Sequence, residues 1–364
     1  MIKESYLHKN LQMQVNLKSF CNLRCDYCAL PQESKSDKQS DEGHLVANTK
    51  KLIEKIKKEG YTLERFFAYG AEPTVVSASV LGAILQVVAD SFPMCSVGFQ
   101  TNGTLLNQDY VGELLKNFRD ENRLFIFWSI DGVKKIHDKH RNNSYGVAME
   151  NLLYVAKNTK VFNRVTCTTN IEHYEDEDSK TELVDFVKIL QENNIDLLMA
   201  AADMTINGIS DSSIKNIEFS EKYCDFIIEN DLIKECGKLT SSGFCYRGGN
   251  ECHKTLFDIN NGNVYLCEKG FDSQTVLSNW FEDSIEKIMQ TRCDATAHAK
   301  IDKECFTCEF AMWCMGGCPI RRTSSGLSHS CHATKKILTH IKEHVNEDWH
   351  GYLLGLQYKA VSNV

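Results

Sequence analysis

Apolar and polar positions follow two alternating periods along the first part of the chain. Apolar residues at 11, 13, 15 and 17 alternate with polar ones, as in a strand, whereas those at 45, 52, 53 and 56 recur as one face of a helix. The exchange repeats downstream and predicts strands at 11–17, 65–69, 95–100, 124–130, 164–169 and 196–200, with helices at 45–56, 80–89, 111–118, 147–156, 183–190 and 218–229. Six strands alternating with six helices predict parallel pairing through right-handed crossovers. Because six strands are too few for a closed eight-stranded barrel, the fold expected is α/β, an open, partial (β/α)6 barrel.

The alternation stops near residue 238, and cysteine, glycine and short polar segments follow up to Cys331. Such a segment is not expected to build a conventional apolar core, so metal ligation would have to organise it. A last amphipathic helix is predicted at about 333–345. The expected organisation is therefore a partial barrel over 1–237, a small cysteine-rich domain over 238–345, and a tail over 346–364.

Composition narrows the class of protein. The chain has 364 residues, of which 42% are hydrophobic and 25% charged, as is usual for a globular protein. The net charge is −8 and no Lys/Arg-rich block occurs, so no nucleic-acid partner is expected. No apolar stretch approaches the roughly 20 residues that span a bilayer, and the opening residues MIKESYLHKN lack the apolar core of a signal peptide. The sequence therefore predicts a cytoplasmic protein that is not in the membrane.

Three of the sixteen cysteines directly follow the first predicted strand. In the absence of a secretory signal, cysteines are expected as metal ligands rather than disulfides. Cys21, Cys25 and Cys28 have the spacing Cys-x3-Cys-x2-Cys, and three thiolates can hold a [4Fe–4S] cluster while one iron keeps no protein ligand. The loop also follows the carboxyl end of a strand, where barrel sites gather. A zinc site is the alternative, although structural zinc usually has four ligands.

A second set of cysteines lies far downstream. It comprises Cys252, Cys267, Cys305, Cys308, Cys314, Cys318 and Cys331, and Cys245 stands seven residues before the first of them. These thiolates suffice for closed clusters, which move electrons. Of the remaining cysteines, Cys95 and Cys167 lie within predicted strands and are expected to be buried filler, and Cys224, Cys236 and Cys293 have no assigned role.

Together the two spacings identify a family. The first loop resembles that of radical S-adenosylmethionine (SAM) enzymes, and the downstream set resembles the SPASM extension of peptide- and protein-modifying members, including anaerobic sulfatase-maturating enzymes. The resemblance covers roughly residues 10 to 340. It implies SAM and three [4Fe–4S] clusters, one binding SAM and two auxiliary. In that chemistry the open iron is chelated by SAM, and reductive cleavage yields a 5′-deoxyadenosyl radical that abstracts hydrogen from the substrate.

The resemblance also implies which residues contact SAM. They are Tyr27, Gly70, Ala71, Glu72, Ser129, Asp131 and Arg141. Tyr27 would lie beside the adenine, and the Gly70–Pro73 segment, where Ala71 departs from the family's Gly-Gly-Glu-Pro, would receive the amino group. Ser129 would bind the ribose or carboxylate and Arg141 the carboxylate, since a guanidinium fork suits that group. The alternatives are a packing role for the Tyr27 ring, a turn without ligand contacts for the Gly70–Pro73 segment, and a surface ion pair for Arg141.

Other polar residues near these positions are expected to support the structure. Residues 100–104 also resemble the family and are given a turn-forming role. His137 and His140, just before Arg141, are expected to be structural rather than ligands.

By the same resemblance the downstream thiols divide into two auxiliary clusters. Cluster I would take Cys245, Cys252, Cys267 and Cys318, and cluster II would take Cys305, Cys308, Cys314 and Cys331. With Cys245 both clusters are closed and suited to electron transfer; without it, cluster I has an open iron that could hold substrate. Glu268 stands where sulfatase-maturating enzymes have an Asp base. It is a candidate general base, with a solvated acid as the alternative.

The leading hypothesis is a radical SAM oxidoreductase that modifies or crosslinks, by a thioether or C–C bond, a ribosomally made peptide. The alternatives are an anaerobic sulfatase-maturating enzyme that forms formylglycine and, from another class, a zinc-ribbon binding scaffold. The expected partners are a precursor peptide or protein and an external electron donor of the flavodoxin or ferredoxin type. Because about ten residues precede the first strand, leader recognition is expected from a separate leader-binding protein or the SPASM face, unless none is needed.

Overall fold

The computed structural model describes residues 9–28, 42–201, 213–235, 254–267, 275–314, 316–319, 322, 324–328 and 331–344. Its strands are β1 (Asn10–Asn16), β2 (Thr62–Ala68), β3 (Ser96–Thr101), β4 (Leu124–Ser129), β5 (Phe162–Thr169), β6 (Asp196–Ala201), β7 (Lys254–Asp258), β8 (Asn263–Tyr265) and β9 (Val276–Asn279). Its α-helices are α1 (Gly43–Lys58), α2 (Ala78–Ser91), α3 (Gln108–Asn117), α4 (Lys134–His140), α5 (Tyr145–Asn158), α6 (Glu177–Glu192), α7 (Ser213–Glu229), α11 (Ile285–Ala297), α12 (Ala311–Cys314) and α13 (Cys331–His344). Short 3-10 turns lie at η3 (Pro73–Val75), η4 (Glu121–Arg123), η5 (Ile171–Tyr174), η6 (Ile233–Glu235) and η7 (Lys303–Phe306).

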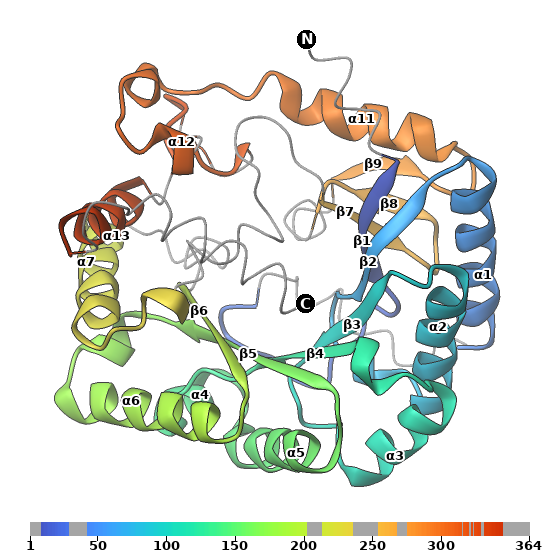
Figure 1. Cartoon of the computed structure of the whole chain (residues 1–364), viewed down its shortest axis with the longest axis horizontal. Coiled ribbons are helices and arrows are strands. Elements are labelled where there is room, and N and C mark those ends of the chain that lie inside the picture. The colour runs from blue at the N-terminus through green and yellow to red at the C-terminus, as the bar shows by residue number, and fades with distance from the viewer. Residues whose placement is uncertain are drawn as a thin grey trace.

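The described strands form one sheet in the order β6-β5-β4-β3-β2-β1-β7-β8-β9. Every neighbouring pair from β1 to β6 is parallel. Figure 1 shows these strands as a curved inner wall, with α1 to α6 along its outside. The predicted partial (β/α)6 barrel is therefore confirmed. Its strand ends bring the loops after β1, β2, β3 and β4 to one rim, because carboxyl ends of parallel strands share an edge.

Alternation along β1 explains how the wall is filled on both faces. Met13 and Val15 are buried in the main apolar core, to which α1 contributes Leu45 and Leu52. The intervening Gln14 and Asn16 are also buried, although polar. Since successive side chains of a strand point to opposite faces, these polar residues face the other side of the sheet. The outer face therefore supplies stability, and the inner face can carry polar groups.

The segment that follows the barrel adds to the same sheet. β7 pairs in parallel with β1, with Asn16 opposite Asp258, and β8 and β9 continue as antiparallel strands. Phe257, Val264, Trp280 and Ile285 are buried in the core that the barrel helices share. The expectation that this segment would lack a conventional apolar core was wrong for this part, because its strands are too short to show periodicity but complete an existing sheet. The sheet is thus continuous across the boundary predicted near residue 238.

Three of the described helices, α4, α11 and the four-residue α12, were not predicted from the sequence, whereas the last one was. α4 spans only seven residues, too few to show a helical period, and α11 is mixed in polarity. The predicted last helix is α13, which buries Ile337 and Ile341 and packs against α7 (Figure 1). No helix among the described residues combines the length and apolar character needed to cross a bilayer.

Candidate active site

The loop after β1 gathers the three cysteines of the first pattern. Cys21 and Cys25 are buried and pack together with Leu23, while Cys28 and Ala71 lie against them. The Cys28 N–H donates to the Cys25 carbonyl at 3.1 Å, which turns the chain. The loop is therefore folded so that its thiols lie in one neighbourhood, beside the turn that follows β2. That donor set fits a cluster held by three thiolates.

Among the residues that the structure describes, no group of three or more His, Cys, Asp or Glu side chains is arranged to hold a metal ion. The assignment of a cluster to this loop consequently rests on the donor set and its surroundings. It stays a prediction.

Hydrogen bonds join the cysteine loop to the end of α4 and to Asn142 after it. The Asp26 N–H donates to the His140 carbonyl at 3.1 Å, and the His140 ring lies 3.1 Å from the Asp26 carboxylate. The Asn142 side chain accepts a hydrogen bond of 2.8 Å from the Arg24 N–H. Asn142 has φ of 57°, a left-handed conformation that asparagine tolerates better than most residues. The chain turns sharply after α4 and presents these groups to the cysteine loop.

Asp131, in the turn after β4, hydrogen-bonds two other residues of the predicted SAM-binding set. Its Oδ2 accepts a hydrogen bond from the Tyr27 hydroxyl and another, of 2.7 Å, from Arg141 Nε. The Arg141 guanidinium also lies over the Tyr27 ring, with Cζ 5.1 Å from the centroid. Three of the predicted SAM-binding residues, from three different segments, are thus brought into contact. Arg141 is buried rather than on the surface, so it does not form the surface ion pair considered as an alternative.

The charge of Arg141 keeps the Asp131 carboxyl ionised. Burial alone would raise the pKa of the Asp131 carboxyl, but Arg141, with smaller contributions from His137 and Tyr27, holds it below its usual value. Burial is also the main cause of the raised pKa of Tyr27, whose hydroxyl stays protonated. Asp131 Oδ1 is buried and accepts no hydrogen bond from any part of the chain that the structure describes. A buried carboxylate oxygen of this kind is suited to a ligand hydroxyl or N–H group.

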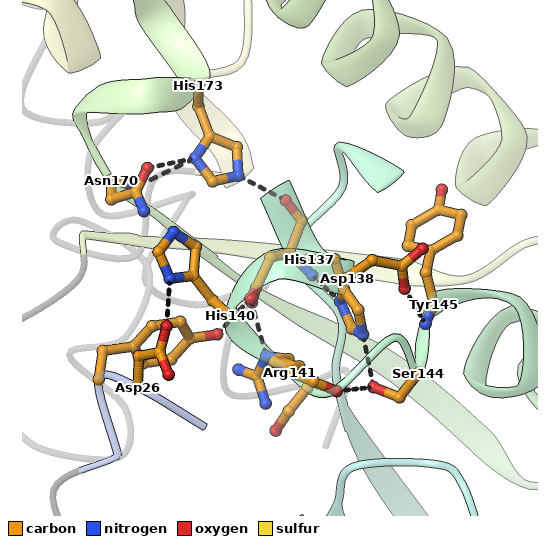
Figure 2. Close-up of polar contacts among 12 residues, drawn as sticks. Asp26, His137, Asp138, His140, Arg141, Ser144, Tyr145, Asn170 and His173 are labelled. Atoms are coloured by element: carbon orange, nitrogen blue, oxygen red, sulfur yellow. Dashed lines mark hydrogen bonds and ion pairs between the residues drawn. The ribbon is translucent and has the colours of Figure 1, made fainter. Parts of the chain in front are cut away.

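Two buried histidines, His137 and His173 (Figure 2), bind the main chain of Asp131, one at its N–H and the other at its carbonyl. The Asp131 N–H donates to His137 Nδ1 at 3.2 Å, and the Asp131 carbonyl accepts from His173 Nε2 at 2.7 Å. Burial lowers the pKa of His137 to about 4 and also lowers that of His173, so both rings are neutral near pH 7. A structural role was expected of His137, whereas His173 was missed. Neither spacing nor composition signals either contact, since they join residues on separate elements.

The turn after β2 is built around Glu72. Its fully buried carboxylate accepts hydrogen bonds from the main chain and hydroxyl of Thr74, from the Thr101 hydroxyl, and from the Asn102 N–H at 2.7 Å. Burial raises the pKa of this carboxyl above its usual value, although the donors oppose the shift. In this structure Glu72 joins the ends of β2 and β3. Its predicted contact with the SAM amino group is not tested and stays a prediction.

Gly70 can be explained by space. It has φ of +135°, and a Cβ there would lie 2.1 Å from Asn16 Oδ1. A side chain is therefore excluded on both conformational and steric grounds. Ala71, the departure from the family motif, packs partly buried beside Leu256 and Tyr265, so alanine is accommodated.

Ser129 ends β4, at the same rim of the sheet. Its hydroxyl accepts a hydrogen bond of 3.0 Å from Gln100 Nε2, which joins the ends of β3 and β4. Its predicted contact with SAM stays a prediction.

Four downstream thiols lie round one small cavity. Cys305, Cys308, Cys314 and Cys331 line it together with Phe310 and other residues. Burial raises the pKa of the Cys314 and Cys331 thiols, and the neighbouring Cys305 and Cys308 add to the shift. Residues 26 positions apart in the chain are thus grouped as the predicted cluster II requires. The grouping supports that assignment, which stays a prediction.

The remaining predicted site residues have a mixed outcome. Cys267 is buried and Cys318 is half-buried, and neither lines the cavity just described. Cys245, Cys252 and Glu268 lie outside the described residues. Cys95 and Cys167 are buried in strands or beside them, as expected of filler, and burial raises the pKa of Cys95 to about 12.

Comparison with known proteins agrees with this geometry. Residues 15–187 match the signature of the Radical SAM superfamily. The cysteine-type anaerobic sulfatase-maturating enzyme of Clostridium perfringens is 22% identical over 358 residues, covering 88% of this chain and 92% of that protein. The serine-type enzyme of Klebsiella aerogenes is 23% identical over 334 residues, covering 85% and 80%.

Solved structures with the same fold cover most of the chain. Histidine-tagged anSMEcpe with bound AdoMet has a TM-score of 0.71 at 18% identity, covering 97% of this chain and 98% of that one. Streptococcus suis SuiB bound to precursor peptide SuiA has a TM-score of 0.63 at 15% identity, covering 90% and 76%. At these identities the likeness establishes the fold.

Proposed function

This chain belongs to the radical SAM superfamily through residues 15–187, and we propose that it is a maturase that oxidatively modifies or crosslinks a ribosomally made peptide. Membership makes it an enzyme that uses SAM with an iron–sulfur cluster, which removes the zinc-ribbon scaffold from the alternatives. The single observation that carries the finer proposal is the second group of thiols. Cys305, Cys308, Cys314 and Cys331 surround one cavity, as a fully ligated auxiliary cluster would need.

Cys21, Cys25 and Cys28 would hold the SAM-binding cluster. With three protein thiolates, the cluster would leave one iron for SAM, and its chemistry would be the reductive cleavage of SAM to a radical that abstracts hydrogen from the substrate. The protein would hold the Cys21–Cys28 loop in place and exclude water from it. Burial of Cys21 and Cys25, together with the hydrogen bonds that the loop N–H groups donate to His140 and Asn142, supports that role.

SAM itself would meet the network round Asp131. Tyr27 and Arg141 both donate hydrogen bonds to Asp131, so the tyrosine ring and the guanidinium are held in position before a ligand binds. Asp131 Oδ1, which accepts nothing from the described residues, is free to accept from a ligand hydroxyl. Arg141 would keep its remaining donors for the carboxylate of the methionine part. Gly70, Ala71, Glu72 and Ser129 complete the proposed set at the same rim.

Two auxiliary clusters would complete the redox machinery, giving three in all. Cluster II would use the four thiols that share a cavity, and cluster I would use Cys267 and Cys318 with Cys245 and Cys252. Oxidation of the substrate releases a second electron and a proton after hydrogen abstraction. The clusters would conduct the electron to an external acceptor, and Glu268 would take the proton. Reduction of the first cluster would need a flavodoxin- or ferredoxin-type donor.

A peptide substrate is supported by the relatives. SuiB was solved with its precursor peptide SuiA, and anSMEcpe was solved with a Cp18Cys peptide. We favour a thioether or C–C crosslink, or another oxidative product, because Glu268 replaces the Asp expected of sulfatase maturation. Recognition of a leader would come from a separate protein or from the SPASM face, if the substrate has one.

Formylglycine formation is the second candidate. Relatives that match along most of their own length include sulfatase-maturating enzymes of both the cysteine and the serine type. A carboxylate is also retained at the position after Cys267. For these two reasons formylglycine formation is retained as the second candidate function.

One pair of incubations distinguishes the two. The anaerobically reconstituted enzyme is reduced with SAM and given either a sulfatase-derived Cys peptide or a short Cys-rich precursor peptide. A crosslinked precursor loses hydrogen and gains no aldehyde, whereas formylglycine reacts with a hydroxylamine probe. A hydroxylamine-reactive sulfatase peptide, with an unchanged precursor, would overturn the leading proposal in favour of the second.

A further inference from the structure

The side chain of Asn102, just after β3, points at the first cysteine of the loop. Its Nδ2 lies 3.8 Å from Cys21 Sγ and donates at 2.9 Å to Asn22 Oδ1. A contact of this length to sulfur is within the usual range for an N–H group and a thiolate, which is a large and soft acceptor. Only a turn-forming role was expected of this segment from the sequence.

The orientation of the amide is determined by its neighbours. Asn102 Oδ1 accepts from the Thr104 N–H at 3.0 Å and from the Thr104 hydroxyl at 2.7 Å. Asn22 Nδ2 in turn donates to the Thr104 hydroxyl oxygen at 2.7 Å. Reversal of the amide would place two donors together at Thr104, so the N–H groups face Cys21.

Glu72 fixes the main chain below this amide. It accepts 2.7 Å and 2.8 Å hydrogen bonds from the Asn102 N–H and the Thr101 hydroxyl. Glu72 is 2% exposed and Asn102 is 6% exposed, so water does not compete with these contacts. The buried carboxylate therefore acts on the cysteine loop through Asn102, over and above any contact of its own with SAM.

Hydrogen bonds to cysteine sulfur are among the factors that set the potential of an iron–sulfur cluster. Reduction adds negative charge to the thiolates, and an N–H pointed at sulfur stabilises that charge. The Leu23 N–H supplies a second such contact, at 3.4 Å from the same sulfur. Loss of the Asn102 donor should make the cluster harder to reduce.

We propose that Asn102, positioned by Glu72, raises the reduction potential of the cluster at Cys21, Cys25 and Cys28 by donating to the Cys21 sulfur. This inference rests on the proposed function, because it requires a cluster at that triplet. It makes Asn102 a positioning and tuning residue rather than a catalytic one. The first electron transfer to the site would then depend on a contact made from β3.

The test uses two matched substitutions in the full-length holoprotein. Asn102→Asp keeps the acceptor for Thr104 and replaces the Nδ2 donors with oxygen. Asn107→Asp adds the same charge in the same loop, and it retains the cap that Asn107 provides to the Tyr110 N–H at 2.9 Å. The midpoint potential is measured by an anaerobic titration followed by electron paramagnetic resonance. The SAM-binding cluster is identified by the change of its signal on adding SAM.

At the solution potential that half-reduces the wild-type cluster, the ratio of reduced to oxidised cluster should fall about tenfold or more in Asn102→Asp, the size expected of one hydrogen bond to a charged group. Asn107→Asp should match the wild type. Asn102→Ser, too short to reach Cys21, should reproduce the fall without added charge. Glu72→Gln, which disturbs the support of Asn102, should shift the potential the same way. Unchanged potentials in both Asn102 variants would overturn the inference, whereas a wild-type triplet without any cluster would overturn the proposed function instead.

Discussion

Arg141 donates from Nε to Oδ2 of Asp131 across 2.7 Å, and the two residues are 7% and 1% exposed. The pair joins the end of α4 to the turn after β4, and through Tyr27 it reaches the cysteine loop. Tyr27 and Asp131 are 104 residues apart in the chain. A buried pair of this kind is costly to break, because removal of one partner leaves the other charged in a dry environment.

Replacing Asp131 should therefore destabilise the fold as well as the site. Asp131→Ala leaves the buried guanidinium of Arg141 without its carboxylate, and the expected loss is about 3–5 kcal/mol in the free energy of unfolding. Urea unfolding measured under argon provides the value. Asp185→Ala is the control, since it breaks an exposed pair with Lys188 at 2.9 Å and should cost about 0–1 kcal/mol. Equal losses in both variants would mean that the Asp131 pair is not a buried ion pair.

Stability should fall as the solution is acidified below neutrality. His137 has its pKa lowered to about 4 in the folded chain, against about 6.5 when unfolded. Between these values the unfolded chain binds a proton that the folded chain does not, so stability is lost as pH falls. His137 alone should contribute about 2 kcal/mol of loss between about pH 7 and about pH 5.

The variant His137→Asn tests the origin of that slope. An asparagine oxygen can replace Nδ1 as the acceptor for the Asp131 N–H, but it does not titrate. The free energy of unfolding is measured by urea unfolding at each pH. Between about pH 7 and about pH 5 it should fall by about 2 kcal/mol less in the variant than in the wild type. His298→Asn, on an exposed histidine just after α11, is the matched control substitution. A slope identical in His137→Asn and in the wild type would contradict the neutral buried ring.

Two glycines should respond in opposite directions to the same substitution. Gly70→Ala places a methyl group 2.1 Å from Asn16 Oδ1 at φ of +135°, so a loss of about 1–3 kcal/mol is expected. Gly112→Ala meets nothing within 4 Å in α3 and should gain about 0.5–1 kcal/mol. Thermal unfolding of the two variants compares them directly. Stabilisation by Gly70→Ala would show that the turn after β2 is not held as described.

Iron content tests the group of thiols round the downstream cavity. Cys308→Ala should reduce the iron of the reconstituted protein by about four atoms per chain, the content of one cluster. Cys293→Ala removes a half-buried thiol outside both predicted sets and should leave the iron unchanged. Iron is assayed chemically after anaerobic reconstitution and gel filtration. Equal iron in the two variants would exclude a cluster at Cys308.

Much of the fold was accessible from the sequence because strand and helix periods differ. The six parallel strands and their outer helices other than α4 were predicted near their observed positions, since each carries a clear apolar pattern. β7 to β9 were not, because three to five residues are too few to show a period. Their place in the sheet is determined by pairing with β1, which no local pattern reveals.

The cysteines of the candidate site were singled out from the sequence more readily than the residues that hold them in position. Tyr27, Asp131 and Arg141 were singled out by resemblance, and the structure brings them together. His173 and the Asn102 contact to Cys21 were missed, because each depends on a neighbour distant in the chain. Glu72 was expected at the ligand, yet its carboxylate mainly joins β2 to β3. Sequence spacing thus singled out cysteines that the structure groups, but it did not reveal the residues that orient them.

The most direct test of the account is cleavage of SAM at the first cysteine loop. Reconstituted protein is reduced anaerobically with SAM, and 5′-deoxyadenosine is quantified for the wild type and for Cys25→Ala. The account predicts 5′-deoxyadenosine from the wild type and none from the variant, while the iron of the downstream thiols is retained. A wild-type protein that carries iron at the triplet yet yields none, or a variant that yields as much as the wild type, would contradict it.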